Sequence, residues 1–152
     1  QRADVVCLLV GRNVNLRNPA LAGIVPTGLE GLFRFVGETE DVPDLMRAMD
    51  VLCMSSAWGD AFPNVLGEAM ALSVPCGATD VGDSRDIVGE SGEVVPPSDS
   101  SALARGLIAM LERPAEERAS RGRAARERVV ENYSLPSVIE QYRQLYERLI
   151  AK

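Results

Sequence analysis

Short apolar runs alternate with helical patterns along almost the whole chain, and this alternation constrains the fold more than any other feature. Continuous apolar runs are typical of strands covered on both faces, and parallel strands need crossover connections, which are usually helices. The sequence therefore predicts an α/β domain over residues 1–152, with a mainly parallel sheet of about five or six strands flanked by helices. The expected strands are 4–10, 32–36, 50–54, 74–79 and 92–95.

Helical patterns fill the intervals between these runs and the C-terminal third. The helical spacing of apolar residues is weak over 16–30, where glycine and proline interrupt it. Ser98, Asp99 or Ser100 is expected to cap the helix that ends near residue 112. The last helix carries one apolar stripe, which fits either core packing or contact with a neighbouring domain. The expected helices are 41–49, 63–72, 84–88, 100–112, 114–132 and 135–150.

Composition excludes several classes of function. The chain has 16 Lys and Arg against 22 Asp and Glu, so its net charge of −6 gives no general attraction to nucleic acid, and no nucleic-acid partner is expected. It has no histidine, which removes a Ser-His-Asp triad, a Cys-His pair and histidine-ligated zinc from these residues. Cys7, Cys53 and Cys76 lie in apolar runs and are predicted to be reduced core thiols.

Several familiar motifs are absent or incomplete. LLVGRNVN is not a GxGxxG fingerprint, and no GxxxxGK[ST] loop occurs. Asp80 and Asp83 offer carboxylates to a metal, but turn formation and helix capping explain them more simply, and no metal site is predicted.

The informative stretch is 50–72, in which a strand ends, a loop follows and Pro63 begins a helix. Open α/β sheets bind ligands at such carboxyl ends of strands. The amides of Asn64 and Val65 lie in the first helical turn, where they have no intrahelical acceptor and carry the positive end of the dipole. A diphosphate fits there, although the dipole contributes only about 0.3–1 kcal/mol, so cations from elsewhere are also expected.

Two acids flank this helix start. Glu68 lies among apolar residues, where an ionised carboxylate needs hydrogen-bonding partners, and its side chain should lean back toward the helix N-terminus. A buried Glu68 that accepts hydrogen bonds from ribose hydroxyls is therefore expected, with Asp60 facing a sugar beyond the phosphates. The simpler alternatives are an edge-exposed helical glutamate for Glu68 and a loop or capping acid for Asp60.

At this point the residues resemble a known family. The segment SSAWGDAFPNVLGEAMA resembles the E-x(7)-E signature of family 4 retaining glycosyltransferases, which have the GT-B fold. Flanking segments resemble the family in the same order, and the match covers nearly the whole chain but only the C-terminal, donor-binding half of such an enzyme. These flanking segments are LLVG, FRFVGETEDVPDLMRAMDVLCMSS, VPCGATDVGDSRDIVG, SGEVVPPSDSSALARGL and ARERVVENYS.

The resemblance implies that the chain is the Rossmann-like half of a GT-B fold and that it binds a nucleotide diphosphate sugar, with UDP or GDP as the nucleotide. It also implies that the enzyme transfers the sugar with retention of the anomeric configuration. It implies no cofactor and no metal. Glu68 would contact the ribose and Asp60 the donor sugar. The remaining nucleotide-binding positions would be Gly11, Val36, Gly37, Glu38, Ala61, Phe62, Pro63, Asn64 and Val65.

The chain departs from the family pattern in three places. Asp60 stands where the family has Glu, and Leu72 and Ser73 replace a small residue and Gly. The Arg and Lys that bind the diphosphate in the family lie upstream of this chain, as does the acceptor-binding N-terminal domain. The 152-residue chain is therefore expected to be an inactive fragment of a cytoplasmic enzyme, whose missing domain would be its partner and could attach it peripherally to the cytoplasmic face of a membrane.

The resemblance implies a hexosyltransferase that acts in glycan, lipopolysaccharide or exopolysaccharide synthesis. Two other functions compete with this one. One is a non-catalytic nucleotide-sugar-binding or assembly module of the same fold, which Asp60 and the missing basic pair would suit. The other is a sugar-nucleotide epimerase of related fold, which the lack of histidine disfavours.

Overall fold

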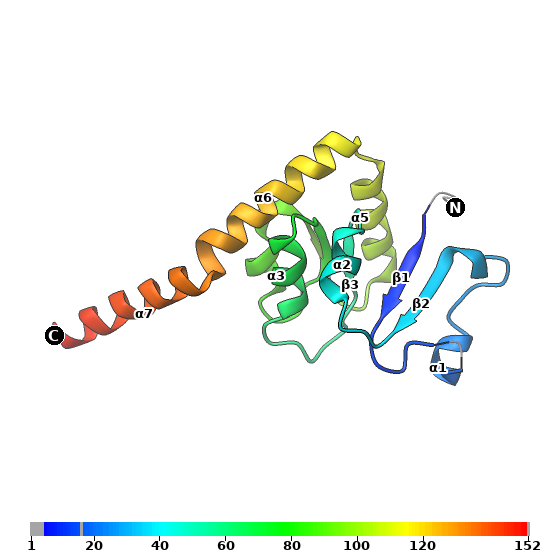
Figure 1. The fold of residues 1–152 in the computed structure, drawn as a ribbon, viewed down its shortest axis with the longest axis horizontal. Coiled ribbons are helices and arrows are strands. Elements are labelled where there is room, and N and C mark those ends of the chain that lie inside the picture. Colours follow the sequence, from blue (N-terminus) through cyan, green and yellow to red (C-terminus); the bar gives the residue numbers. More distant parts are fainter. Residues whose placement is uncertain (1–4, 16, 152) are drawn as a thin grey trace. The chain divides into compact units, whose positions relative to one another are not determined.

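The computed structural model describes residues 5–15 and 17–151, which divide into two compact units at the boundary between Val42 and Pro43. Figure 1 shows the elements of both units, and each unit is described by itself. Asp4 and Leu16, which begin an expected strand and an expected helical stretch, lie outside the described residues.

The first unit contains a two-stranded parallel sheet, in which β1 (Cys7–Val10) pairs with β2 (Phe33–Gly37). The register shifts between Leu9 and Val10, so the strands end with Val10 opposite Gly37. The weak helical pattern between them yields only one short helix, α1 (Pro19–Ala22), and a 3-10 turn, η1 (Glu30–Leu32). The Asn18 side chain caps α1 by accepting a hydrogen bond from the Ala20 amide.

The second unit contains a three-stranded parallel sheet in the order β3-β4-β5. The five strands predicted from the sequence are thus all present, but they pair in two sheets rather than one. The strands are β3 (Leu52–Met54), β4 (Cys76–Thr79) and β5 (Glu93–Val95). The helices are α2 (Val42–Arg47), which begins at the boundary, α3 (Asn64–Ala71), α4 (Ser84–Val88) with the 3-10 turn η2 (Gly89–Ser91), α5 (Ser100–Glu112), α6 (Ala115–Tyr133) and α7 (Leu135–Ile150).

The core of the second unit surrounds β4, whose four residues are all buried. Leu66, Ala69 and Met70 form the inner face of α3 and are fully buried. Burial raises the pKa of the Cys76 thiol to about 12, so this thiol stays protonated. Of the three predicted core thiols, Cys76 is buried and Cys7 is half-buried. The prediction is wrong for Cys53, which lies on the exposed face of β3.

Helix α6 lies against α3 (Figure 1), and a glycine allows the close approach. A Cβ atom at Gly122 would overlap the carbonyl oxygen of Ser73, at the turn that follows α3. Arg126 of α6 also donates a hydrogen bond to the carbonyl oxygen of Ala71. Ser73 itself has a φ of 63°, in the left-handed region that glycine adopts most easily, and it occupies the position where the resembled family carries Gly.

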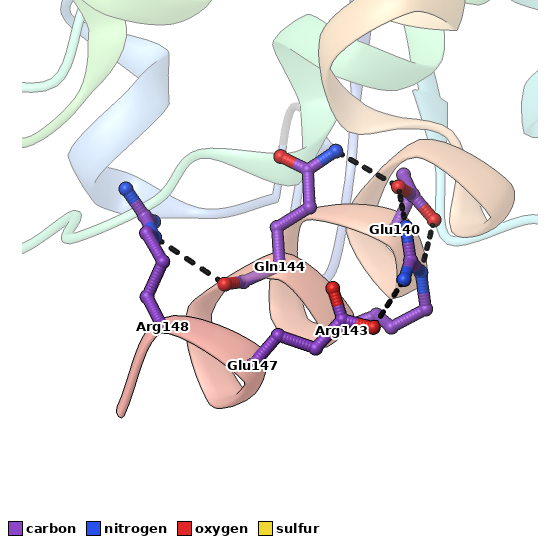
Figure 2. A network of polar contacts seen from close by, with 5 residues as sticks. All are labelled: Glu140, Arg143, Gln144, Glu147 and Arg148. Atoms are coloured by element: carbon purple, nitrogen blue, oxygen red, sulfur yellow. Dashed lines mark hydrogen bonds and ion pairs between the residues drawn. The ribbon is translucent and has the colours of Figure 1, made fainter. Parts of the chain in front are cut away.

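Helix α7 exposes the apolar stripe that its sequence predicts. Ser134 caps the helix through the Ser137 amide, and residues 141–150 are all exposed. Its polar side carries a network around Arg143, which donates to Glu140 and Glu147, as Figure 2 shows. Hydrogen bonds from Arg143 and then from Gln144 lower the pKa of Glu140 to about 2. Because its charges are paired with each other, this face has little net charge to offer a partner.

The contact at Gly122 can be tested by substitution. Gly122→Ala is expected to lower the free energy of unfolding by about 1–3 kcal/mol, because the new methyl group would collide with backbone rather than with a flexible side chain. Gly106→Ala in α5 is the matched control, since its Cβ would make only ordinary contacts and the change should stabilise the helix by about 0.5–1 kcal/mol. Urea denaturation measures both, and equal effects of the two substitutions would contradict the packing argument.

The network of α7 predicts a pH dependence. Because the pKa of Glu140 is lowered, its contribution to stability is present above the ordinary glutamate value of 4.5 and is lost as the pH falls toward about 2. Carboxyl-carbon NMR should find Glu140 still ionised at about pH 3.5. Arg143→Gln should raise the titration midpoint of Glu140 more than Gln144→Ala does. A midpoint near the ordinary glutamate value in the unsubstituted chain would refute the role of the Arg143 hydrogen bonds.

Candidate functional site

The loop between β3 and α3 begins at a buried anchor. Thr79, at the end of β4, is 2% exposed and donates its hydroxyl hydrogen bond to the carbonyl oxygen of Ser56 at 2.6 Å. This bond joins the carboxyl ends of two neighbouring parallel strands, which is the edge where α/β sheets hold their ligands. The sequence predicted this strand, loop and helix order, and the structure confirms it.

Helix α3 starts with open amides. Pro63 is the N-cap, and no side chain makes a capping hydrogen bond there. The Leu66 amide already donates to the Pro63 carbonyl at 3.1 Å, whereas the amides of Asn64 and Val65 precede the first intrahelical bond. These two N–H groups are free of a side-chain cap, as a site for an anionic group requires.

Glu68 is exposed, so the prediction of a buried acid in α3 is wrong. Residues advance by about 100° around a helix, which places Glu68 about 200° from Leu66 and away from the inner face formed by Leu66, Ala69 and Met70. Its apolar neighbours in sequence are therefore not its neighbours in space. The exposed alternative holds for Glu68, and any contact with a ribose rests on its place in the signature segment rather than on burial.

The other signature acid, Asp60, is half-buried, and Ala61 and Phe62 after it are exposed. Within residues 5–15 and 17–151, neither Asp60 nor Glu68 has a hydrogen-bond or ion-pair partner for its carboxylate. Two carboxylates near one helix start are thus available to accept hydrogen bonds from hydroxyl donors.

The loop that carries Asp60 is supported by the turn after β4, a contact that the sequence does not predict. The Asp83 amide donates to the carbonyl oxygen of Ala61 at 2.9 Å. Gly82, with a φ of 55°, leaves space for the carbonyl oxygens of Asp60 and Ala61, which a Cβ at this position would overlap. The turn residues around Gly82 were a visible signal, but nothing in the sequence indicated which loop they would meet.

In the first unit, the predicted nucleotide-binding positions gather at the carboxyl ends of β1 and β2. Gly11 donates its amide hydrogen bond to the carbonyl oxygen of Gly37 at 2.8 Å. Val36 is 39% exposed, and Glu38 lies 3.6 Å from Arg12 in an exposed ion pair. The sequence therefore identified residues of this unit that are close together in space.

The two acids of the β4–α4 turn differ in their contacts. Asp80 accepts two hydrogen bonds from the Arg85 guanidinium. Asp83 occupies the N-cap position of α4, but its side chain makes no capping hydrogen bond. In the described part of the chain, no three His, Cys, Asp or Glu side chains gather as metal ligands. No helix there has the length and hydropathy needed to cross a bilayer.

Comparison with known proteins identifies the family. The family described as glycosyl transferases group 1 matches residues 1–113. The chain belongs to this family. The phosphatidyl-myo-inositol mannosyltransferase of Mycobacterium leprae is 36% identical to this group 1 chain over 148 residues, which cover 95% of the chain and 38% of that relative. The N-acetyl-alpha-D-glucosaminyl L-malate synthase of Bacillus anthracis is 30% identical over 120 residues, covering 78% of the chain and 31% of that relative.

Solved structures of other proteins share the fold of this group 1 chain. The Anabaena protein HepE, solved in complex with UDP-glucose, superposes with a TM-score of 0.77 at 24% identity, covering 99% of the chain and 42% of HepE. The predicted α/β fold and family are thus confirmed. The chain spans about two fifths of the length of the Mycobacterium leprae relative and of HepE.

Proposed function

We propose that this chain is the donor-binding part of a retaining glycosyltransferase that moves a sugar from a nucleotide diphosphate sugar to an acceptor. The observation that carries the proposal is the pair of acids in the signature segment, Asp60 before the uncapped start of α3 and Glu68 within the helix, whose carboxylates have no partner among the described residues. Carboxylates that accept hydrogen bonds suit ribose and sugar hydroxyls, while open amides suit the diphosphate.

Each part of the site has a role in this proposal. Glu68 accepts hydrogen bonds from the ribose hydroxyls, and Asp60 contacts the donor sugar. The backbone of residues 61–65 approaches the sugar and diphosphate. In the first unit, residues 36–38 border the base, and Gly11 is a further nucleotide-binding position. A phosphate oxygen of the leaving nucleotide takes the acceptor proton, so the reaction needs neither a histidine base nor a metal ion.

The chain does not by itself supply the positive charge that a diphosphate needs. The helix dipole contributes about 0.3–1 kcal/mol to phosphate binding, which is too little for a diphosphate in a chain with a net charge of −6. Cations from an upstream domain complete the site, and that domain holds the acceptor in the cytoplasm or at the cytoplasmic face of a membrane. The chain alone then binds nucleotides weakly and transfers no sugar.

Calorimetry with UDP, GDP and ADP tests the binding role. Weak saturable binding of one of them is expected, and Glu68→Ala should weaken it about ten- to a hundredfold, because hydrogen bonds to a charged group are worth about 1.5–3 kcal/mol. Stability should change by less than about 0.5 kcal/mol, since Glu68 is exposed. Glu127→Ala on the exposed surface of α6 is the matched control, and equal affinities of the two variants would refute the ribose contact.

Turnover distinguishes an enzyme from a non-catalytic module, which the aspartate at position 60 would suit. In a longer chain that includes the upstream domain, sugar transfer is expected from the unsubstituted protein, and Asp60→Asn should reduce kcat/KM at least about tenfold by removing the charged acceptor. The matched variant is Asp60→Glu, which restores the family residue. No transfer by the unsubstituted protein together with transfer by Asp60→Glu would establish the non-catalytic module instead.

A further inference from the structure

The last residue of α6 reaches the loop that carries Asp60. The ring of Tyr133 meets the ring of Phe62 edge-to-face, with centroids 5.7 Å apart and planes inclined by 65°. This is a favoured geometry for an aromatic pair. Phe62 is 46% exposed and stands between Asp60 and the helix start at Pro63, so this contact is a side-chain support for an otherwise exposed part of the loop.

The orientation of the Tyr133 ring is fixed at its other end. Its hydroxyl donates a hydrogen bond to the carbonyl oxygen of Asp86, in α4, at 3.0 Å. Tyr133 therefore joins three segments that are distant in sequence, namely the end of α6, helix α4 and the loop before α3. A tyrosine held at both ends presents its ring in one position, which a freely rotating side chain would not.

The carbonyl group that holds Tyr133 is itself immobilised by α6. Arg128 donates from Nε to the carbonyl oxygen of Ile87 at 3.0 Å and from a second nitrogen to that of Asp86. A Cβ at Gly89 would lie 2.7 Å from this guanidinium, so glycine makes room for the arginine against the end of α4. Arg128 and Tyr133 thus attach the same stretch of α4 backbone to α6. The loop before α3, which contacts Tyr133 through Phe62, is supported by this attachment.

We propose that Tyr133 is a positioning residue of the donor site, which fixes Phe62 and through it the Asp60 carboxylate. The inference rests on the proposed function, because it assigns Tyr133 to the loop that contacts the sugar. Glu68 lies on α3, whose inner face is held independently by the core. Loss of the Tyr133 ring therefore affects the recognition of the sugar more than the recognition of the nucleotide.

Calorimetry with UDP and UDP-glucose, and with GDP and GDP-mannose, separates these two parts of binding. Tyr133→Ala should lower the affinity for the sugar nucleotide about three- to tenfold and should lower the affinity for the matching nucleotide diphosphate by less. Tyr133→Phe keeps the ring but loses the hydrogen bond to Asp86, so it should restore only part of the loss. Phe62→Leu should reproduce the loss from the other side, with no further loss when combined with Tyr133→Ala. The matched control is Tyr142→Ala, which removes an exposed tyrosine of α7 whose ring stacks on Tyr146 instead.

Hydrogen exchange tests the support without any ligand. The Asp83 amide is bonded to the carbonyl oxygen of Ala61, so it should exchange faster in Tyr133→Ala than in the unsubstituted chain, while the amides of β4 keep their protection. Unchanged exchange at Asp83, or an unchanged affinity for the sugar nucleotide, would overturn the positioning role. If the unsubstituted chain binds none of these nucleotides, the proposed function fails, and the exchange of Asp83 still decides whether Tyr133 fixes the loop.

Discussion

The candidate site depends on one close approach between two backbone segments. The carbonyl oxygens of Asp60 and Ala61 lie where a side chain at position 82 would begin, and the Asp83 amide donates to Ala61. Glycine alone leaves this space and also adopts the left-handed φ of 55° without strain. The turn after β4 therefore fixes the path by which the chain enters α3. Because β4 is fully buried, the direction of the open amides is ultimately set by the core.

The elements of the second unit could be predicted because their signals are local. Continuous apolar runs identify buried strands, and a capping side chain identifies where a helix begins. Asp99, one of the three expected candidates, caps α5 through the Ala102 amide. Ser134 caps α7. The stretch after β1 carries no such pattern, and only a four-residue helix forms there. The pairing of strands into two sheets was not predictable, since periodicity reports that a strand is buried but not which strand lies beside it.

The sequence predicts which residue types form the candidate site, but it does not predict their environment. The signature segment identified Asp60 and Glu68, whereas the expected burial of Glu68 came from neighbours in sequence and ignored the helical rotation that turns it outward. The contacts that support the loop could not be predicted from local sequence patterns, for a different reason. Phe62 meets Tyr133, and Ala61 meets Asp83, only after the strands and helices between them have packed. Contacts of this kind produce no recognisable spacing pattern in the sequence.

An exposed Glu68 suits the proposed role better than the buried one first expected. A buried ionised carboxylate must be satisfied by the protein, and its partners would then compete with a ligand for the same oxygens. An exposed carboxylate is hydrated until ribose hydroxyls replace the water, so its hydrogen bonds stay available for recognition. Recognition of hydroxyls and neutralisation of phosphate are then separate tasks. In the proposed enzyme, this acidic chain performs the first, while the second requires cations that its own net charge of −6 does not supply.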